Sequence, residues 1–133
     1  MEDVFAGSLM SSPVYTVTAD TSFRNAGNVM LENSIGSVII VDDDDQLEGI
    51  VTATEFIEVI AKGNSDPDTT VGTVMTTELI TTTANDSIQT VADLMIEHGI
   101  QHLPVIEDGA VIGLISSTDM AADLSSLRDP SPA

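Results

Sequence analysis

Cysteine and tryptophan are absent from this chain, and positively charged residues are scarce. The absence of cysteine excludes disulfide bonds and thiolate metal sites, and the two histidines are too few for a histidine metal site, so no metal is expected. Three Lys and Arg residues face 22 Asp and Glu residues, which gives a net charge of −19. Binding to a nucleic-acid backbone or an anionic membrane needs clustered Lys and Arg. The composition therefore predicts no direct nucleic-acid partner and no membrane partner.

The acidity is not accompanied by the low hydrophobicity of a disordered chain. Hydrophobic residues make up 42% of the sequence, which indicates a packed core. Self-repulsion destabilises such a compact chain at ordinary ionic strength, whereas molar salt shortens the Debye length to roughly 3 Å and screens the charges. We interpret the composition as halophilic. No apolar run approaches the ~18 residues of a membrane span, and the first residues lack a signal-peptide pattern, so a cytoplasmic location is expected.

An internal repeat organises the sequence. Sliding the chain by sixty-five places aligns Leu9-Met10 with Val74-Met75, and Val29-Met30-Leu31-Glu32 with Leu94-Met95-Ile96-Glu97. One extra residue in the first acidic loop changes the offset to sixty-four, and Gly49-Ile50-Val51-Thr52 then matches Gly113-Leu114-Ile115-Ser116. A match along both halves predicts two copies of one structural unit. Because aromatic residues are only 3% of the chain, the cores must be built from Val, Ile, Leu, Met and Ala.

Each copy is expected to fold in the order β-α-β-β-α. A short strand leads to a helix opened by Asp20 or Thr21 in one copy and by Asp86 in the other, since such side chains cap free amides. Two β-branched runs predict buried strands, and a last helix closes the unit. The expected strands are Val14–Val17, Ser37–Val41, Leu47–Val51, Leu79–Thr83, His102–Ile106 and Val111–Ile115, and the last helices are Thr52–Ala61 and Ser117–Leu127. The apolar stripes of the first helices are Phe23, Ala26, Val29 and Met30 in one copy and Ile88, Val91, Ala92, Met95 and Ile96 in the other.

The repeat also predicts the domain boundaries. Residues 8–62 form the first repeat, and residues 73–127 form the second. Residues 63–72, rich in Gly, Asp and Thr, are expected to be an exposed linker, and residues 128–133 a frayed tail. Residues 1–8 are expected either to form a short helix or to be disordered.

The second copy contains two phrases that resemble a known family. Gly99-Ile100-Gln101-His102-Leu103-Pro104-Val105-Ile106 and Gly113-Leu114-Ile115-Ser116-Ser117-Thr118-Asp119, within the repeated β-α-β-β-α order, are similar to the CBS domain, which occurs in pairs. The likeness spans residues 8 to 124. It implies an α/β (α+β) fold in which two repeats pack as a pseudo-twofold pair with two clefts between them. It also implies a regulatory module that binds an adenosine-type ligand (AMP, ADP, ATP or S-adenosylmethionine), signals to a partner protein and forms a homodimer.

The resemblance further implies the ligand-binding residues. Asp119 would accept charge-assisted hydrogen bonds from both ribose hydroxyls. Ser116 would bring a hydroxyl and the free amides of a helix start to the ribose or phosphate, and His102 occupies a position where phosphate-binding members carry a basic residue. The expected second site is Thr77, Thr81, Ile100, Gln101, His102, Pro104, Ser116, Thr118 and Asp119, and the expected first site is Thr16, Ile35, Gly36, Ser37, Thr52 and Glu55.

The first copy departs from this pattern. Glu55 replaces the expected Asp and is one methylene longer, and Gly36-Ser37 replaces Gln101-His102, so the second site is favoured. Two alternatives remain open at this point. Asp119 can be a first-turn acid, and Ser116 and Thr52 can be helix caps, rather than ligand contacts. The pair can also be an assembly module with vestigial clefts.

The remaining polar residues do not indicate catalysis or metal binding. No Ser-His-Asp arrangement, phosphate-binding Gly-rich loop or evident carboxylate pair is found, so no enzyme activity is expected, with His102 as the one candidate acid or base. Asp42–Asp45 lacks the spacing of a calcium loop and predicts a solvated turn. His98 precedes Gly99 and is interpreted as a helix-end residue. The repeat-related Met30 and Met95 are expected in the cores.

Overall fold

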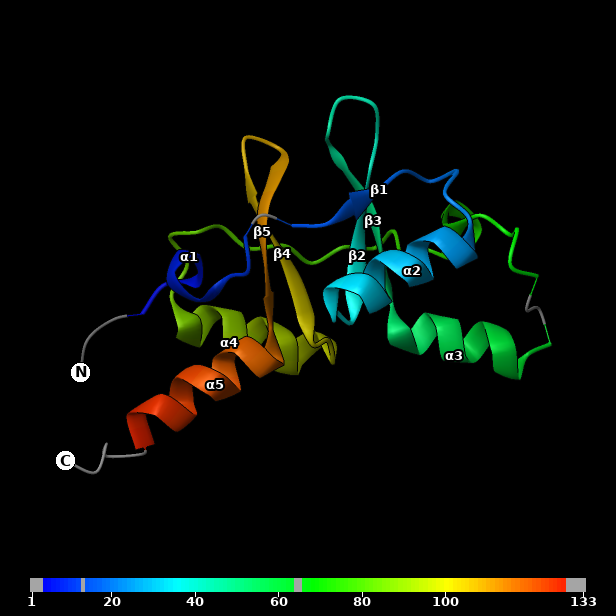
Figure 1. Cartoon of the computed structure of the whole chain (residues 1–133). Coiled ribbons are helices and arrows are strands. Elements are labelled where there is room, and N and C mark those ends of the chain that lie inside the picture. Colours follow the sequence, from blue (N-terminus) through cyan, green and yellow to red (C-terminus); the bar gives the residue numbers. More distant parts are fainter. Residues whose placement is uncertain (1–3, 13, 64–65, 129–133) are drawn as a thin grey trace. The chain divides into compact units, whose positions relative to one another are not determined.

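The computed structural model describes residues 4–12, 14–63 and 66–128, with side chains up to residue 123. The chain divides into two compact units (Figure 1). The first-repeat unit is Val14–Leu79, and the second-repeat unit comprises the described parts of Met1–Pro13 and Ile80–Ala133. The first-repeat unit is thus continuous in sequence, whereas the second-repeat unit is assembled from two separate segments.

The first-repeat unit contains a three-stranded sheet. Strand β2 (Ser37–Val41) lies between β1 (Thr16–Val17), which is parallel to it, and β3 (Leu47–Thr52), which is antiparallel. Helix α2 (Phe23–Asn33) precedes β2, and α3 (Ala53–Ala61) follows β3 directly. The core joins three residues of α2 to the alternate residues of the sheet that face it, namely Phe23, Ala26, Met30, Val38, Ile40 and Val51.

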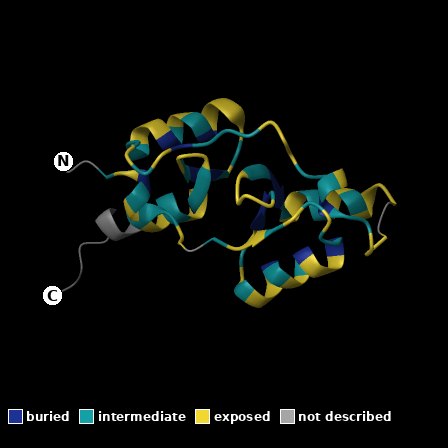
Figure 2. Cartoon of the chain, turned by 90° about the horizontal axis from the view of Figure 1, so that it is seen from above, coloured by how far each residue is buried: buried dark blue, intermediate teal, exposed yellow. Residues whose placement is uncertain are grey.

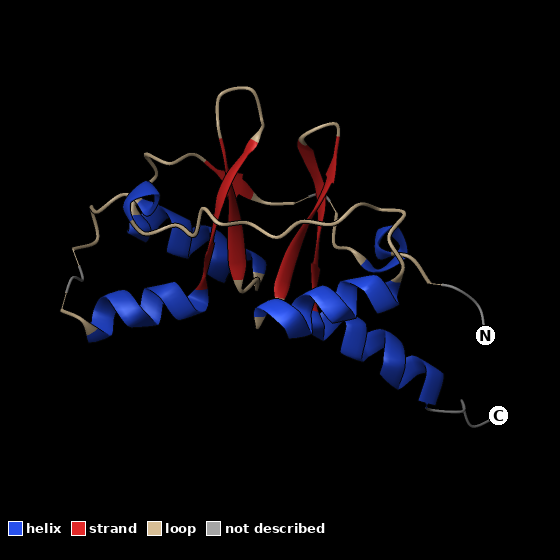
Figure 3. Ribbon diagram, turned by 180° about the vertical axis from the view of Figure 1, so that it is seen from behind, coloured by secondary structure: helices blue, strands red, loops and turns tan. Residues whose placement is uncertain are grey.

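The second-repeat unit contains the corresponding hairpin. Strands β4 (His102–Glu107) and β5 (Ala110–Ser116) are antiparallel, between α4 (Ile88–His98) and α5 (Ser117–Arg128). Figure 3 shows both hairpins as red ribbons, each followed directly by a helix at the end of its second strand. The core consists of Ala6, Val91, Met95, Leu103, Val105 and Ile115, and Ala6 comes from the short N-terminal helix α1 (Ala6–Leu9). The predicted mixed α and β fold is confirmed.

The strand expected at Leu79–Thr83 is wrong. The structure shows there only an isolated parallel bridge between Thr82 and Val105, while the expected strand at Val14–Val17 is shortened to β1. In the first-repeat unit the amide of Ile39 donates to the carbonyl of Tyr15 at 3.4 Å. Pro104 stands at the repeat-equivalent position of Ile39 and has no N–H to donate. The second-repeat unit therefore loses one of the hydrogen bonds that would extend this pairing into a strand.

The residues predicted to open the first helix of each repeat are also wrong. The caps are Ser22, whose hydroxyl accepts from the Asn25 amide at 3.1 Å, and Ser87, which accepts from the Thr90 amide at 3.2 Å. Asp86 instead accepts from the Thr82 hydroxyl at 2.6 Å and the Thr83 amide at 2.9 Å. Asp86 therefore stabilises the turn before the helix rather than the helix end.

The predicted apolar stripes are correct except at one position. Figure 2 shows buried residues along one side of helices α2 and α4. Both Met30 and Met95 are buried as expected. Ile96, however, is 79% exposed, and its repeat equivalent Leu31 is 80% exposed. Two matching large apolar side chains thus face away from the cores.

The end of the expected linker belongs to the first-repeat unit. Residues 66–68 are exposed, but Val71 is fully buried and begins a 3₁₀ turn, Val71–Thr73, so an exposed linker is wrong at this end. We call residues 71–76 the first strap, because Thr76 then pairs with Ile50 on β3. The N-terminal residues 6–11 form the matching second strap on β5. Of the tail expected at residues 128–133, Arg128 instead ends helix α5, and residues 129–133 lie outside the described residues.

Candidate ligand-binding site

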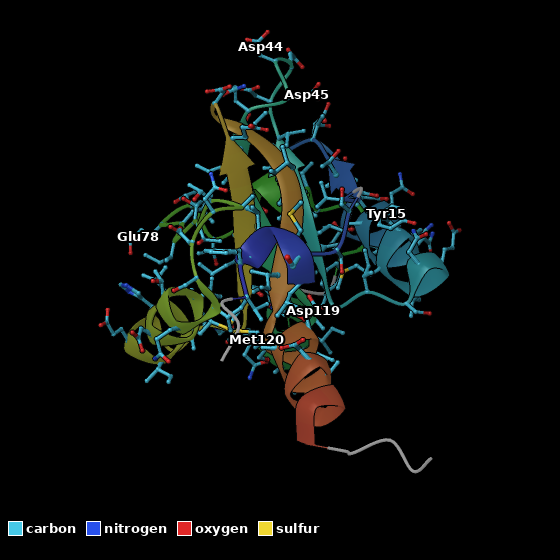
Figure 4. All side chains as sticks on the ribbon, turned by 90° about the vertical axis from the view of Figure 1, so that its left-hand side faces the viewer. Tyr15, Asp44, Asp45, Glu78, Asp119 and Met120 are labelled. Atoms are coloured by element: carbon cyan, nitrogen blue, oxygen red, sulfur yellow. The ribbon has the colours of Figure 1, made fainter. Side chains whose placement is uncertain are left out.

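In the second-repeat unit, several predicted site residues meet where β5 ends and α5 begins. His102, the first residue of β4, lies directly opposite Ser116, the last residue of β5. The amide of Ser117 donates to the carbonyl of Gln101 at 2.9 Å, which connects the start of α5 to the start of β4. Figure 4 labels Asp119 in the first turn of α5. We call this group the second corner.

Asp119 and Ser116 bond to each other across this helix start. The Ser116 amide donates to Asp119 Oδ2 at 2.9 Å, and the Asp119 amide donates to Ser116 Oγ at 3.1 Å. These are the reciprocal bonds of a helix cap, so the capping role considered from the sequence is present. Only one of the two carboxylate oxygens takes part in this pair of bonds. Capping and ligand contact are therefore compatible for Asp119.

The first-repeat unit has a matching first corner. Ser37 lies opposite Thr52, and the Ala53 amide donates to the Gly36 carbonyl at 2.9 Å. Glu55 Oε2 accepts from the Thr52 amide at 3.0 Å and also from the Thr52 hydroxyl. Its other oxygen, Oε1, accepts from the Thr76 hydroxyl at 3.0 Å. Both carboxylate oxygens of Glu55 are therefore engaged by the protein.

A buried hydroxyl without a partner also belongs to the first corner. Ser37 is 2% exposed, and among the described residues its Oγ has no hydrogen-bond partner. Because directly paired residues of an antiparallel ladder point to the same face, Ser37 shares a face with Thr52. Buried polar groups are nearly always bonded, so the first corner contains an unmet hydrogen-bonding demand.

Thr76 contacts the first corner, and sequence reasoning missed it. It lies on the first strap, and the repeat alignment that pairs Met75 with Met10 also pairs Thr76 with Ser11 on the second strap. Ser11 exchanges backbone bonds with Leu114 of 2.7 and 3.1 Å, as Thr76 does with Ile50 of 3.0 and 3.2 Å. The repeat could reveal this equivalence, but not the contact of Thr76 with Glu55, which is 21 residues away.

The other predicted residues are distributed between the two units. Ile100 and Thr118 adjoin the second corner, and Thr81 precedes the bridge at Thr82, whose amide donates to the Pro104 carbonyl at 3.0 Å. Thr77 belongs to the first-repeat unit, just after the first strap. The remaining predicted residues of the first site also lie in that unit: Thr16 on β1, and Ile35 next to the first corner.

The second corner carries little positive charge. Arg24 and Lys62 both belong to the first-repeat unit, and His102 is the basic side chain among the second-corner residues. Within residues 4–12, 14–63 and 66–128, no group of three or more His, Asp or Glu side chains could hold a metal ion. The corner therefore offers hydroxyls, amides and one carboxylate, which suit a sugar better than a polyphosphate.

A separate hollow of about 670 Å³ lies in the first-repeat unit. Its wall includes the α3 residues Glu55, Glu58 and Lys62, with Phe23 and Val74 as apolar neighbours. Of the predicted first-site residues only Glu55 lines it. The hollow thus lies beside the first corner rather than at the strand ends.

Sequence comparison assigns this double strand-to-helix architecture to one class of protein. The family described as "CBS domain" matches the chain twice, over residues 6–62 and 71–126. The matches cover most of the chain. The chain therefore belongs to the CBS-domain family, as a tandem pair.

Relatives of the chain have varied contexts. It is 33% identical over 108 residues to the mitochondrial CBS domain-containing protein CBSX3 of Arabidopsis thaliana, covering 77% of this chain and 52% of that protein. It is 29% identical over 116 residues to inosine-5'-monophosphate dehydrogenase of Nitrosopumilus maritimus, covering 86% of this chain but 23% of the enzyme. The chain thus spans about half of one relative and a quarter of the other.

A solved structure has the same fold. The CBS domain pair of protein MJ0100, in complex with 5'-methylthioadenosine and S-adenosyl-L-methionine, superposes with a TM-score of 0.89 at 23% identity. The match covers 96% of this chain and all of that one. Among the described residues of the present chain, no helix is long and apolar enough to cross a membrane.

Proposed function

We propose that this chain is a non-catalytic regulatory module that binds an adenosine-type ligand at the second corner and signals its presence to a partner protein. The observation that carries the proposal is the Asp119 carboxylate, fixed by the Ser116 amide through one oxygen at the end of β5. A carboxylate held in this way can accept bonds from two adjacent ribose hydroxyls. The complex of the CBS pair of MJ0100 with two adenosine compounds supports this class of ligand.

Charge favours some adenosine ligands over others. A net charge of −19 and a single basic side chain at the second corner oppose the binding of polyphosphates. We expect ATP and ADP to bind no better than AMP, and S-adenosylmethionine, which is cationic at sulfur, to bind best. Titration calorimetry in molar potassium chloride with these four compounds checks the order. A marked preference for ATP would contradict it.

Thermal unfolding tests whether any such ligand binds. A ligand that prefers the native state raises the free energy of unfolding, by about 2.7 kcal/mol at a hundredfold excess over Kd, and therefore raises the unfolding temperature. The protein in high potassium chloride is heated with AMP, ADP, ATP or S-adenosylmethionine at millimolar concentration. A shift with at least one compound is expected, and no shift with any of them would sink the proposal.

Signalling requires two arrangements with different ligand affinity. The exposed apolar side chains on the helices favour homodimer formation as part of this mechanism, since Leu31 is 80%, Ile96 79%, and Ile57 and Ile60 each 66% exposed. We therefore propose a cytoplasmic homodimer whose assembly responds to ligand. Light scattering of the wild type and of Leu31→Glu with Ile96→Glu checks this, and a monomeric wild type would contradict it.

An assembly module without ligand is the second candidate. The engaged carboxylate of Glu55 favours it for the first corner. Asp119→Asn separates the two functions, because the amide oxygen can still accept from Ser116 while the charge is lost. Ligand sensing is supported if ligand no longer raises the unfolding temperature of Asp119→Asn while its oligomeric state remains that of the wild type. Assembly alone is supported if the wild type and Asp119→Asn form the same oligomer and ligand changes the unfolding temperature of neither.

A further inference from the structure

The two corners differ in how the strap meets the acidic residue. In the first-repeat unit the Thr76 hydroxyl donates to Glu55 Oε1 at 3.0 Å, while Thr52 holds Oε2. In the second-repeat unit the equivalent strap residue is Ser11, and within the described part of the chain Asp119 takes no hydrogen bond from it. Two differences bear directly on this contact: Glu55 is one methylene longer than Asp119, and Thr76 replaces Ser11.

The position of Thr76 is fixed by the rest of the first strap. The Thr76 amide donates to the Ile50 carbonyl at 3.0 Å, and the Thr76 carbonyl accepts from the Ile50 amide at 3.2 Å. The strap begins at the fully buried Val71, whose amide donates to the Thr21 carbonyl at 2.8 Å. Met75 lies against Gly49, and a Cβ added to Gly49 would lie 2.9 Å from the Cγ of Met75. Backbone hydrogen bonds and packing thus hold Thr76 within hydrogen-bonding distance of Glu55.

A carboxylate whose two oxygens already accept from protein donors has reduced capacity for the two hydroxyls of a ribose. The Ser37 hydroxyl is a second sign of a suppressed site at the same corner, because it is 2% exposed and unpartnered among the described residues. Because buried hydroxyls are nearly always bonded, the Ser37 hydroxyl can bond a polar molecule that enters this corner. Both observations fit a polar site that is closed by its own strap.

We propose that Thr76 acts as a latch that keeps the first corner closed, so that the chain binds one adenosine-type ligand, at the second corner, and holds a latent second site. This rests on the proposed function for the ligand class. Release of the Thr76 bond frees Glu55 Oε1 and gives a ligand access to the corner that contains Ser37. The number of ligands per chain, rather than the affinity of the first one, is then set by the strap.

Binding stoichiometry tests the latch. Equilibrium dialysis in molar potassium chloride uses S-adenosylmethionine and AMP as probes with the wild type, Thr76→Val, Asp119→Asn and the double variant. We expect one ligand per chain in the wild type and two in Thr76→Val. Asp119→Asn should bind none, and the double variant should regain one. Ser11→Ala, at the equivalent strap position, is the matched control and should stay at one.

The outcomes separate the latch from the proposed function. Two ligands in the wild type, or one in Thr76→Val, overturns the latch while leaving ligand binding intact. If neither the wild type nor any variant binds a ligand, the proposed function is overturned. The role of the strap in setting the number of ligands per chain is then overturned with it. Hydrogen exchange without ligand tests the contact itself: the strap amides of Gly72 to Thr76 should exchange at least severalfold faster in Thr76→Val, and equal rates would show that the hydroxyl does not hold the strap.

Discussion

Ser116 and Asp119 bond reciprocally at the start of α5, with amide-to-side-chain distances of 2.9 and 3.1 Å. The same carboxylate that is proposed to hold a ribose therefore also stabilises the helix in the absence of any ligand. Its substitution must change both the stability of the protein and its ligand binding.

Asp119→Ala is expected to lower the free energy of unfolding by about 1 kcal/mol without ligand, because the helix start loses its capping acceptor. Asp119→Asn should lose less stability, since its amide oxygen can still accept the Ser116 bond. Denaturant unfolding in molar salt measures both. Asp123→Ala on the same helix removes the same charge away from the cap and should have little effect. Equal losses at the two positions would show that the cap contributes nothing.

The straps predict that two glycines cannot be replaced without cost. A Cβ on Gly49 would lie 2.9 Å from Met75 Cγ and 3.0 Å from the backbone oxygen of Thr76. Overpacking of this kind costs about 1 to 3 kcal/mol. A Cβ on Gly113 would meet Met10 more closely, at 2.8 Å from Cγ, but its three nearest atoms all belong to that flexible side chain, which can shift. Because the Thr76 backbone oxygen cannot shift in this way, Gly49→Ala should destabilise the protein more than Gly113→Ala.

Gly27→Ala is the control for Gly49 and Gly113, the two strand glycines that face the straps. Gly27 lies within α2, and its added Cβ would meet only Phe56, at 3.5 Å or more. It should stabilise the protein by about 0.5 to 1 kcal/mol, because alanine loses less backbone entropy in a helix. Thermal or denaturant unfolding of the three variants gives the order, and a destabilised Gly27→Ala together with a neutral Gly49→Ala would contradict it.

Asp86 should titrate below the ordinary range for an aspartate. The Thr82 hydroxyl, followed by the Thr83 amide, lowers the pKa of Asp86 by bonding its charged form. Since the folded-state pKa is depressed, the stabilisation is complete above the unfolded-state pKa and is lost as the pH falls through the folded-state pKa. The effect on stability is small because solvent still screens this partly exposed carboxylate.

Thr82→Val checks this cause. The variant keeps the side-chain shape but removes the first donor, so the pKa of Asp86 should rise toward its ordinary value in an NMR titration of the side-chain carbon. Thr90→Val, which removes a hydroxyl near Ser87 instead, should leave the pKa of Asp86 unchanged. An unshifted Asp86 in the wild type would show that the Thr82 bond is not maintained in solution.

Salt should stabilise the protein through charge screening. With a net charge of −19, the unfolding temperature should rise steeply with potassium chloride up to about 1 M, as the Debye length falls from about 10 to about 3 Å. Replacing the exposed Asp43 and Asp44 by Asn should weaken this dependence, while Asp42, which accepts the amides of Asp44 and Gln46, is left in place. A flat salt response would contradict the halophilic interpretation of the composition.

The sequence predicted the fold because the repeat appears twice with the same periodicity. The strand expected at Ser37–Val41 has those bounds in the structure, because a run of β-branched residues that is buried on both faces can adopt few other secondary structures. The helix caps were wrong because Asp20, Thr21 and Ser22 are consecutive capping residues, and the choice among them depends on where the preceding turn ends. Local propensity does not contain that information.

The contacts within the candidate site were predicted less completely than the fold. The family phrases point to Ser116, Asp119 and His102, and the structure places all three at one strand end. The contact of Thr76 with Glu55 and the unpartnered hydroxyl of Ser37 could not be predicted, because both depend on how the first strap lies along β3. Contacts that are distant in sequence are set by tertiary packing.

The division of the chain between units has a consequence for its synthesis on the ribosome. All residues of the first-repeat unit have been made once Leu79 has been added. Residues 6–11, made earlier, must wait for Ala84, Asp86 and Leu114, whose carbonyls accept the amides of Gly7, Ala6 and Ser11. Residues 6–11 are thus placed only after most of the second-repeat unit has been made, and until then their apolar side chains lack the core against which they pack.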